Sequence, residues 1–525
     1  ALEASVNEIV RRHEVLRTGI EVIAGHPVQR VHELCPVPLP VTDLSELSLE
    51  HEEIDNIIQT DITALFCFSM PPLFRLRLLK FAPQDHVLVL AMHHIISDGW
   101  SMGLFIEELT VLYSALSKGE KSSLPPLALQ YADYSRWQHE LSSRDFWHYQ
   151  MSYWKKHLAE PLPVLELPFA RPRPQLSGID GKRFEFGWPA HFLKELNAFN
   201  HRKGVTLFMT LLAALNAVLH RYTRQTDIIV GTVIANRNRL ETEQMIGFFL
   251  NLLALRTRFD ANPTFAGLLN CARETTLDAY ACQDVPFEKI VEEVQPVRDL
   301  SRSPIFQVLL VVQNAPMRPL ELPGLTIENV DVKHDISKFD LSLYFREEQD
   351  HLSGSVEYNP HLFDATSTER ITVHLQRLLQ AAIQHPDVPL SEIPFITPEE
   401  QRIIELAHPS LASAAQAANA SQQYGAAQEE QQFVPPVTPT QKTVAEIWKR
   451  VLELEDVSIH QKFFEIGGDS LRLVQVFLEL NQVYPDKLSV AELFSHNTVA
   501  SLSARLDALA ANGMELQSAL QAYEL

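Results

Sequence analysis

Two neighbouring histidines after an apolar run are the first residues that could do chemistry. His93 and His94 follow the apolar run 87–92, and Asp98 and Gly99 come shortly after them. An imidazole can take or give a proton near neutral pH because its ordinary pKa is about 6.5. An aspartate beside a glycine fits a tight turn, where the carboxylate can anchor an arginine and the missing Cβ leaves room for a substrate chain. The pattern indicates a catalytic turn at a strand end, with plain packing or weak metal ligation as alternatives.

The spacing of the two histidines bears on the metal alternative. Adjacent residues of a strand point to opposite faces, so His93 and His94 cannot ligate one ion together without a bend. We therefore predict no metal site. The same alternation favours a division of labour, in which one imidazole faces a cavity and the other is buried as support.

A serine after two glycines is the second candidate. Ser470 follows Gly467-Gly468-Asp469 and precedes the helical pattern 471–480. A serine at a helix N-terminus exposes its hydroxyl, and the free amides and the positive end of the helix dipole favour a phosphodiester there. The alternative is an ordinary serine that caps a helix.

Apolar patterns around these residues predict the elements that position them. Between 1 and 170 we expect helices and strands around the histidines, and Arg171-Pro172-Arg173-Pro174 then interrupts regular structure because proline disfavours helix in the preceding residue. From 171 to 404 the alternation repeats. The sequence thus predicts an α/β fold of two halves of similar size, each a sheet with packed helices. The predicted helices are 1–18, 101–116, 146–158 and 207–222, and the predicted strands are 74–78 (half-buried), 87–92 (fully buried), 227–231 and 305–312.

The composition changes after residue 404. Residues 405–436 are rich in Ala, Gln, Ser, Glu and Pro and hold too few apolar side chains to offset the entropy of ordering, so we predict a linker, with a solvated helix as the alternative. Residues 437–512 carry four helical patterns, which are typical of a small bundle. A short tail, 513–525, follows.

Charge and cysteine content limit the class of protein. The 525 residues have a formal net charge of −22, which argues against nucleic-acid binding. The apolar runs are far shorter than a membrane span and no signal-peptide pattern opens the chain, so we expect no membrane association. Four cysteines without metal-ligand spacing favour a reducing cytoplasm as the location.

The histidine motif occurs with several others that together resemble the condensation domain of non-ribosomal peptide synthetases. The resemblance covers residues 1 to about 400. Its further motifs are Arg11-Arg12-His13-Glu14-Val15-Leu16-Arg17-Thr18, Tyr131-Ala132-Asp133-Tyr134, Tyr153-Trp154, Arg171-Pro172-Arg173-Pro174, Ile246-Gly247-Phe248-Phe249-Leu250-Asn251 and Gln283-Asp284-Val285-Pro286-Phe287-Glu288.

This resemblance implies a fold and a site. It implies two chloramphenicol-acetyltransferase-like lobes in a V, with carriers reaching the histidines from opposite mouths of a tunnel. It also implies that His94 faces the reaction, with His93, Asp98 and Gly99 beside it. Asp98 is then structural and paired with an arginine, for which the sequence leaves two candidates, Arg17 and Arg237. These two arginines and Asn251 are the residues expected to support the site.

The implied reaction is attack of an acceptor amine on a donor thioester, which yields an amide and a carrier thiol. An α-amine with a pKa of about 7.7–8.0 is partly neutral near pH 7, so a strong base is not essential. His94 is expected either to take the ammonium proton or to orient the amine by a hydrogen bond.

The segment 437–512 resembles a peptidyl carrier domain, which implies 4′-phosphopantetheine attached to Ser470. The implied partners are an upstream donor carrier, an adenylation domain or loading enzyme in trans, a phosphopantetheinyl transferase, and a downstream module or release domain. The chain therefore reads as a condensation–carrier didomain with acyltransferase activity. The alternatives are an epimerisation-type enzyme, a coenzyme A-dependent acyltransferase and a non-catalytic scaffold for carrier docking.

Overall fold

The computed structural model describes most of the 525 residues, and its contacts divide the chain into two units, 1–417 and 418–525. The residues left undescribed are 47–50, 143–144, 168–170, 172, 175–177, 179, 297–298, 300, 314–319, 331–335, 407–433, 453, 462, 464–465, 467–475, 477–478, 481–482, 485–492, 494–495, 497 and 510–525.

The first lobe of the larger unit has a sheet of three strands in the order β3 (Val41–Asp43), β4 (Phe74–Ala82), β5 (Asp85–Met92). A separate hairpin precedes the sheet. Along β4, Phe74 and Leu76 are buried while Arg75 and Arg77 are half-buried on the other face, as the alternation of a strand requires. The other elements of this lobe are α1 (Leu2–Arg12), the 3-10 turn η1 (Glu14–Arg17), β1 (Thr18–Ile23), β2 (His26–Val31), α2 (His51–Thr63), the 3-10 turn η2 (His94–Ile96), α3 (Gly99–Leu116) and α4 (Tyr131–Ser142).

The prediction that residues 87–92 form a fully buried strand is wrong. β5 is an edge strand that pairs only with β4, and only Val89 and Ala91 of its residues are buried. The apolar run is needed because α1 and α3 cover one face and α2 packs near the other, where Val89 joins a small cluster with Ile58 of α2.

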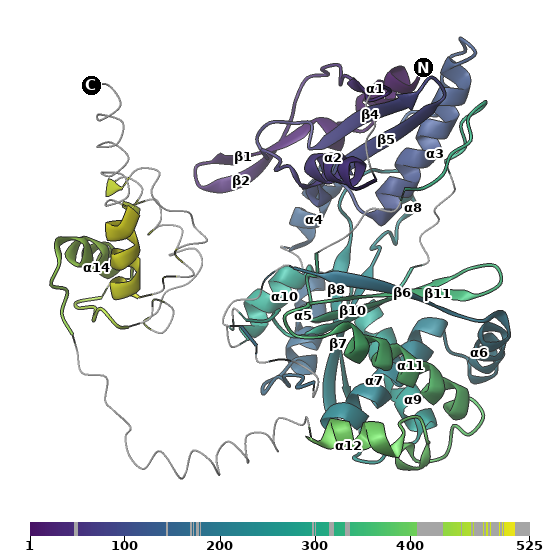
Figure 1. The fold of residues 1–525 in the computed structure, drawn as a ribbon, viewed down its shortest axis with the longest axis vertical. Helices are drawn as coiled ribbons and strands as arrows, with labels where there is room; N and C mark the ends of the chain where they lie inside the picture. Colours follow the sequence, from purple (N-terminus) through teal and green to yellow (C-terminus); the bar gives the residue numbers. More distant parts are fainter. Residues whose placement is uncertain are drawn as a thin grey trace. The chain divides into compact units, whose positions relative to one another are not determined.

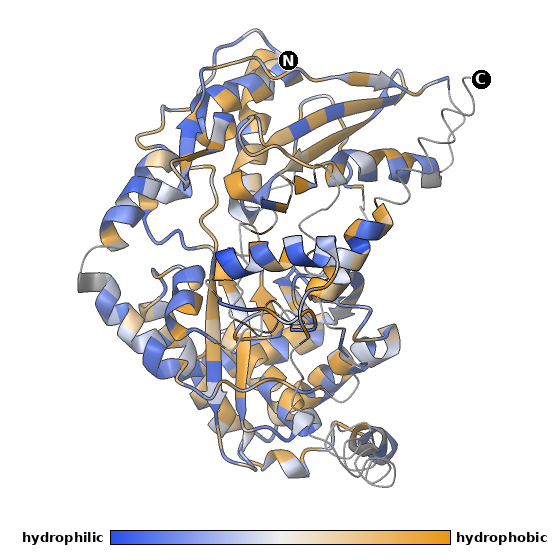
Figure 2. Ribbon diagram, turned by 90° about the vertical axis from the view of Figure 1, so that its left-hand side faces the viewer, coloured by the Kyte–Doolittle hydropathy of each residue, from blue (hydrophilic) through white to orange (hydrophobic). Residues whose placement is uncertain are grey.

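The second lobe is built on a sheet of six strands, with helices packed against it (Figure 1). Its core helix α7 (Leu207–Thr223) contacts α9 (Phe265–Ala281) and α11 (Ala365–Ala382) and is buried along most of its length. Figure 2 shows apolar residues along the central strands of this sheet. The strand order is β6 (Lys182–Trp188), β11 (Leu352–Tyr358), β10 (Leu341–Glu347), β9 (Val308–Val312), β7 (Asp227–Ile234), β8 (Asn251–Arg258). The helices are α5 (Asp145–His157), α6 (Ala190–Lys203), α7 (Leu207–Thr223), α8 (Leu240–Glu243), α9 (Phe265–Ala281), α10 (Phe287–Val294), α11 (Ala365–Ala382), the 3-10 turn η3 (Leu390–Glu392) and α12 (Pro398–Leu406).

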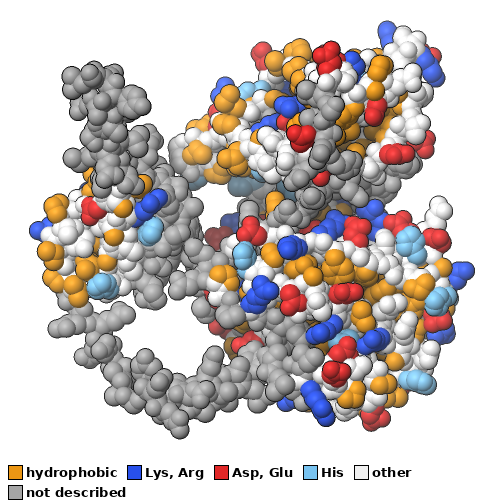
Figure 3. All heavy atoms as spheres, viewed as in Figure 1, with side chains coloured by type: hydrophobic (Ala, Val, Ile, Leu, Met, Phe, Trp, Pro, Cys, Tyr) orange, Lys and Arg blue, Asp and Glu red, His pale blue; other side chains and the backbone are white. Residues whose placement is uncertain are grey.

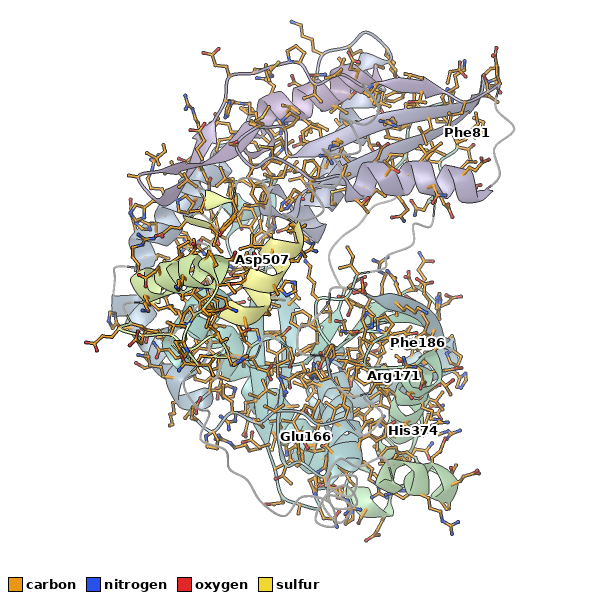
Figure 4. All side chains as sticks on the ribbon, turned by 60° about the vertical axis from the view of Figure 1, so that its left-hand side comes forward. Phe81, Glu166, Arg171, Phe186, His374 and Asp507 are labelled. Carbon is orange, nitrogen blue, oxygen red and sulfur yellow. The ribbon has the colours of Figure 1, made fainter. Side chains whose placement is uncertain are left out.

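The two halves are therefore α/β as predicted, but they are not equivalent. The second sheet has twice as many strands as the first. Its core also takes in Trp154 and Leu158 from the α5 region, which precede residue 171, where the sequence places the start of the second half. Close packing continues to the sheet edge, where a Cβ on Gly354 of β11 would lie 2.3 Å from the ring of Phe186 on β6 (Figure 4).

The smaller unit has a core of its own around α14 (Pro439–Leu452) and the helical residues 499–509. Trp448 of α14 lies edge-on to Phe463 at 4.9 Å, and Thr440 donates a hydrogen bond to Asp507 at 2.6 Å (Figure 4). Figure 3 shows apolar, charged and histidine side chains together on the described surface of this unit. Ser470 and most of the helical pattern 471–480 that was predicted after it lie outside the described residues, as do most of the predicted linker and the tail after residue 512.

Among the described residues, no single helix is both long and apolar enough to cross a membrane, although α6 and α7, which meet at 101°, would pass on length and composition together.

Candidate active site

The histidine turn starts where β5 ends. The backbone N–H of His93 still donates to the carbonyl of Leu73 at 2.9 Å, and residues 94–96 then form a 3-10 turn. The two rings meet different surroundings: His93 keeps an extended backbone just beyond the end of β5, and His94 is the first residue of the turn.

His93 packs inside the first lobe. Its ring lies edge-on to Phe68 at 4.9 Å and to Phe66 at 5.9 Å, and its Nδ1 accepts a hydrogen bond from the backbone of Ile95 at 3.0 Å. Partial burial lowers the pKa of His93, and the nearby His94 and Lys338 lower it further. His93 is half-buried, so it supports the turn without being sealed in the core.

His94 is exposed and its ring has a fixed orientation. Nδ1 lies 2.9 Å from the carbonyl oxygen of Ser97, which can only accept, so Nδ1 carries the proton and donates. In the neutral ring Nε2 is then unprotonated and has a lone pair to offer. Phe248, from the second lobe, lies edge-on to the ring at 5.7 Å.

Asp98 is buried behind this turn and caps the next helix. Its Oδ1 accepts from the backbone N–H of Ser101 at 2.8 Å, which satisfies a free amide in the first turn of α3. Its Oδ2 accepts from the backbone N–H of Phe249 at 3.0 Å. One carboxylate thus joins α3 to a segment of the second lobe.

Arg237 is the arginine that pairs with Asp98, at 3.1 Å, and both side chains are almost completely buried. Its other donors reach the carbonyls of Thr242 and Met245 and the hydroxyl of Ser101. Burial lowers the pKa of Arg237 and the charge of Asp98 raises it in return, with burial the larger effect.

The other candidate, Arg17, does not contact Asp98. Its guanidinium donates to the carbonyl of His32 at 2.6 Å and to Glu14 at 3.0 Å, both within the first lobe. Arg17 therefore braces the hairpin that follows α1, and the sequence offered no signal that separated it from Arg237.

Residues 235–250, which join β7 to β8, cross to the first lobe, and we call them the crossing segment. The hydroxyl of Tyr131 donates to the carbonyl of Phe248 at 2.7 Å, and the hydroxyl of Ser101 donates to that of Gly247 at 2.8 Å. A Cβ on Gly247 would lie 2.2 Å from the Tyr131 ring, so only glycine allows this approach. The segment carries both Arg237 and Phe248 to the histidine turn.

A second buried charge, that of Glu108, lies beside His13, which also contacts the crossing segment. Nδ1 of His13 accepts from the backbone N–H of Ile246 at 3.3 Å, while its Nε2 lies 3.2 Å from Glu108. Glu108 also forms a two-point ion pair with Arg12. His13 of the motif 11–18 therefore contacts the crossing segment directly, and Arg12 pairs with the Glu108 that lies beside His13.

Asn251 anchors the base of the site at the start of β8. Its Nδ2 donates to the carbonyls of Gln283 and Val285, and its Oδ1 accepts from the backbone N–H of Phe287 at 3.0 Å. It thereby joins two of the quoted motifs. At the other end of the site, a Cβ on Gly99 would meet nothing within 4 Å, so open space lies in front of it.

Sequence reasoning missed the groups that fix His94. The Ser97 carbonyl has no sequence signal, because any residue supplies one. Phe248 was predicted only as part of a motif and Ser101 only as the first residue of a helix, so neither was predicted to help fix the turn. Among the described residues, no group of three or more His, Cys, Asp or Glu could hold a metal ion.

Comparison with known proteins places this site in a family. Residues 1–405 match the family described as Condensation domain. The chain belongs to this family. Residues 442–506 match the phosphopantetheine attachment site family, whose members carry 4′-phosphopantetheine on a serine.

Curated relatives of this condensation-family chain are large synthetases. Gramicidin S synthase 2 of Brevibacillus brevis is 37% identical over 403 residues, which cover 77% of this chain and 9% of that protein. Malpinin synthetase of Mortierella alpina is 37% identical over 404 residues, which cover 77% of this chain and 5% of that protein. The chain thus spans a tenth or less of the length of these relatives.

Solved structures show the same fold. The X-domain from teicoplanin biosynthesis has a TM-score of 0.69 and 28% identity, covering 75% of this chain and 89% of that one. The first condensation domain of the calcium-dependent antibiotic synthetase has a TM-score of 0.62 and 19% identity, covering 75% and 90%.

Proposed function

We propose that this chain forms an amide bond between a carrier-bound acyl or peptidyl thioester and an acceptor amine, as part of a non-ribosomal peptide synthetase. The observation that carries the proposal is the state of His94. Its ring is exposed and its Nδ1 is held by the Ser97 carbonyl, while among the described residues its Nε2 has no hydrogen-bond partner and can meet a substrate. Catalysis needs such a group held in place before the substrate arrives.

The reaction balances with one proton transfer. The amine nitrogen attacks the thioester carbon and a tetrahedral adduct forms. Nε2 of His94 accepts the ammonium proton, or holds the amine by a hydrogen bond while the proton leaves by another route. The C–S bond then breaks, the leaving sulfur takes up the proton that the nitrogen has lost, and an amide and a thiol result. Both roles require the tautomer that the Ser97 carbonyl imposes.

The other residues of the motif position this group. Asp98 and Arg237 lock the start of α3 to the crossing segment, His93 fixes the base of the turn against Phe66 and Phe68, and Gly99 leaves the approach open. We propose Asp98 and His93 as positioning residues, because their described contacts are with the protein.

We propose Ser470 as the attachment residue in the carrier unit. The 4′-phosphopantetheine group, when attached, supplies the thiol that holds an acyl group as a thioester. The phosphopantetheine attachment family match spans residues 442–506 and includes Ser470. A phosphopantetheinyl transferase would load it, and the mass of the intact chain should rise by one arm after incubation with that enzyme and coenzyme A. No gain, or a gain that persists in Ser470→Ala, would overturn this assignment.

The proposed partners follow from the reaction. The donor thioester comes from an upstream carrier, and an adenylation domain or a loading enzyme in trans supplies the acceptor amino acid. A downstream module or a release domain takes the product.

Reconstitution tests the function. The full chain, with its carrier loaded with an aminoacyl group, is mixed with a donor carrier that bears an acyl thioester, and the amide on the carrier is measured by mass spectrometry. We expect amide formation that requires both thioesters. Transfer from coenzyme A alone, or inversion of the amino acid without amide formation, would contradict the proposal.

A docking scaffold is the second candidate. The X-domain from teicoplanin biosynthesis, 28% identical to this chain, was also solved in complex with OxyB, so this fold can bind another protein. Tight carrier binding without turnover in the same assay would favour this second function.

A further inference from the structure

Side chains hold the crossing segment at five consecutive residues where it meets the histidine turn. Residues 245–250 are neither helix nor strand, so their backbone groups need partners from elsewhere in the protein. The partners are Arg237 at Met245, His13 at Ile246, Ser101 at Gly247, Tyr131 at Phe248 and Asp98 at Phe249. His13 is the partner that comes from the end of α1.

The contacts of His13 define its tautomer. The side chain is buried, with 1% exposed. The backbone N–H of Ile246 can only donate, so the Nδ1 that it meets at 3.3 Å is unprotonated. In the neutral ring the proton then lies on Nε2, which is 3.2 Å from a carboxylate oxygen of Glu108 on α3. His13 therefore has the opposite tautomer to His94, whose proton lies on Nδ1.

Glu108 favours this tautomer because it is a buried carboxylate. Arg12 donates two hydrogen bonds to it, at 2.9 and 3.0 Å. Burial raises the pKa of Glu108, and the hydrogen bonds from His13 and Arg12, with the positive charge of Arg12, lower it by more. An ionised carboxylate only accepts, so it draws the imidazole proton to Nε2. Nδ1 is left to accept from the crossing segment.

Ile246 connects this contact to His94. Its side chain is 1% exposed and packs in the core of the first lobe. Phe248, two residues later, lies edge-on to the His94 ring at 5.7 Å. Two residues of extended chain span at most about 7 Å. A displacement of the Ile246 backbone should therefore move the aromatic ring that lies beside His94.

We infer that His13 is a positioning residue for His94. Its Nδ1 holds the backbone of Ile246, and this keeps Phe248 against the imidazole of His94. His13 acts through the crossing segment and not by contact with a substrate. The inference rests on the proposed function, in which the His94 ring meets the acceptor amine.

Two substitutions separate the two contacts of the His13 ring. Asparagine places an amide oxygen near the position of Nδ1 and can accept from Ile246, whereas glutamine places its amide near Nε2 and reaches only Glu108. His13→Gln should slow single-turnover amide formation by the full chain about tenfold or more, and His13→Asn about threefold at most, because small misplacements near a reacting group are costly. Equal rates in the two variants, or an unchanged rate in His13→Gln, would overturn the inference.

His374→Gln is the matched control. His374 is also fully buried, and it contacts Tyr222 and Glu400 in the second lobe. Its replacement should lower the free energy of unfolding and leave the rate of amide formation unchanged well below the unfolding temperature. If the rate fell alike in His13→Gln and His374→Gln, it would follow stability alone, and the inference would be wrong.

The ring signals of His94 distinguish this inference from the proposed function. In the full chain with ¹⁵N-labelled histidine, His13→Gln should shift or broaden the two ring nitrogen signals of His94, while His13→Asn and His374→Gln leave them in place. Unchanged His94 signals in His13→Gln would contradict the role of His13. A parent chain that forms no amide but shows this response would refute the proposed function and leave the positioning role standing.

Discussion

His94 and Asp98 belong to one short motif, yet they occupy opposite environments. His94 is exposed and, within the part of the chain that the structure describes, one of its ring nitrogens has no hydrogen-bond partner, whereas Asp98 is buried and each of its oxygens accepts a hydrogen bond. The buried pair of Asp98 and Arg237 holds one end of the turn, and the turn in turn holds the exposed imidazole of His94 in place. The motif thus combines a reactive imidazole with a buried carboxylate that anchors the backbone. Substitution of His94 should lower the rate, whereas substitution in the Asp98–Arg237 pair should lower the stability.

Replacement of the exposed His94 should have the largest effect on the rate of amide formation. His94→Ala should lower single-turnover amide formation by about 10²–10⁴-fold, the usual contribution of a positioned acid–base group. Thermal unfolding should hardly change, because the side chain is exposed. Full turnover in this variant would remove His94 from the mechanism.

Replacement of Arg237, the buried partner of Asp98, should act mainly on stability. Arg237→Ala leaves Asp98 charged and buried, which costs about 3–5 kcal/mol of unfolding free energy. The double variant Asp98→Asn/Arg237→Ala should lose less than the sum of its single variants, because the two residues form one network. Urea unfolding of the two single variants and of the double variant measures these losses of unfolding free energy. Additive losses would show that the pair is not coupled.

Two glycines give a matched comparison of closed and open space. Gly247→Ala places a Cβ against Tyr131 and should cost roughly 1–3 kcal/mol, as overpacking does. Gly99→Ala meets no protein atom, so it should keep the stability and reduce turnover by narrowing the approach to His94. Equal stability of both variants would contradict the close packing at Gly247.

His157, which is half-buried, should affect stability in acid. Burial, with Arg256 as the next cause, lowers the pKa of His157 to about 4. Below its ordinary pKa of about 6.5 the unfolded chain takes up a proton that the folded chain refuses, so stability falls as the pH falls from 6.5 toward 4. His157→Gln should reduce the loss between pH 7 and pH 5 by roughly 1–2 kcal/mol. An unchanged pH profile would contradict this.

The sequence predicted the motif elements well because their signals are local. The apolar run before His93 and the helix after Gly99 both appear in the structure, since strand and helix patterns depend on nearby residues. It misjudged the burial of 87–92, because a continuous apolar run does not reveal which strand lies at an edge. The partner of Asp98 could not be chosen, because Arg237 is 139 residues away and reaches it only through the crossing segment.

The tautomer of His94 tests the account most directly. Selective ¹⁵N labelling and NMR of the full chain, with this ring in its neutral form, should show a protonated Nδ1 and an unprotonated Nε2, with the ring accessible to solvent. A proton on Nε2 and a bare Nδ1 would break the link to Ser97 and contradict the proposed role of His94.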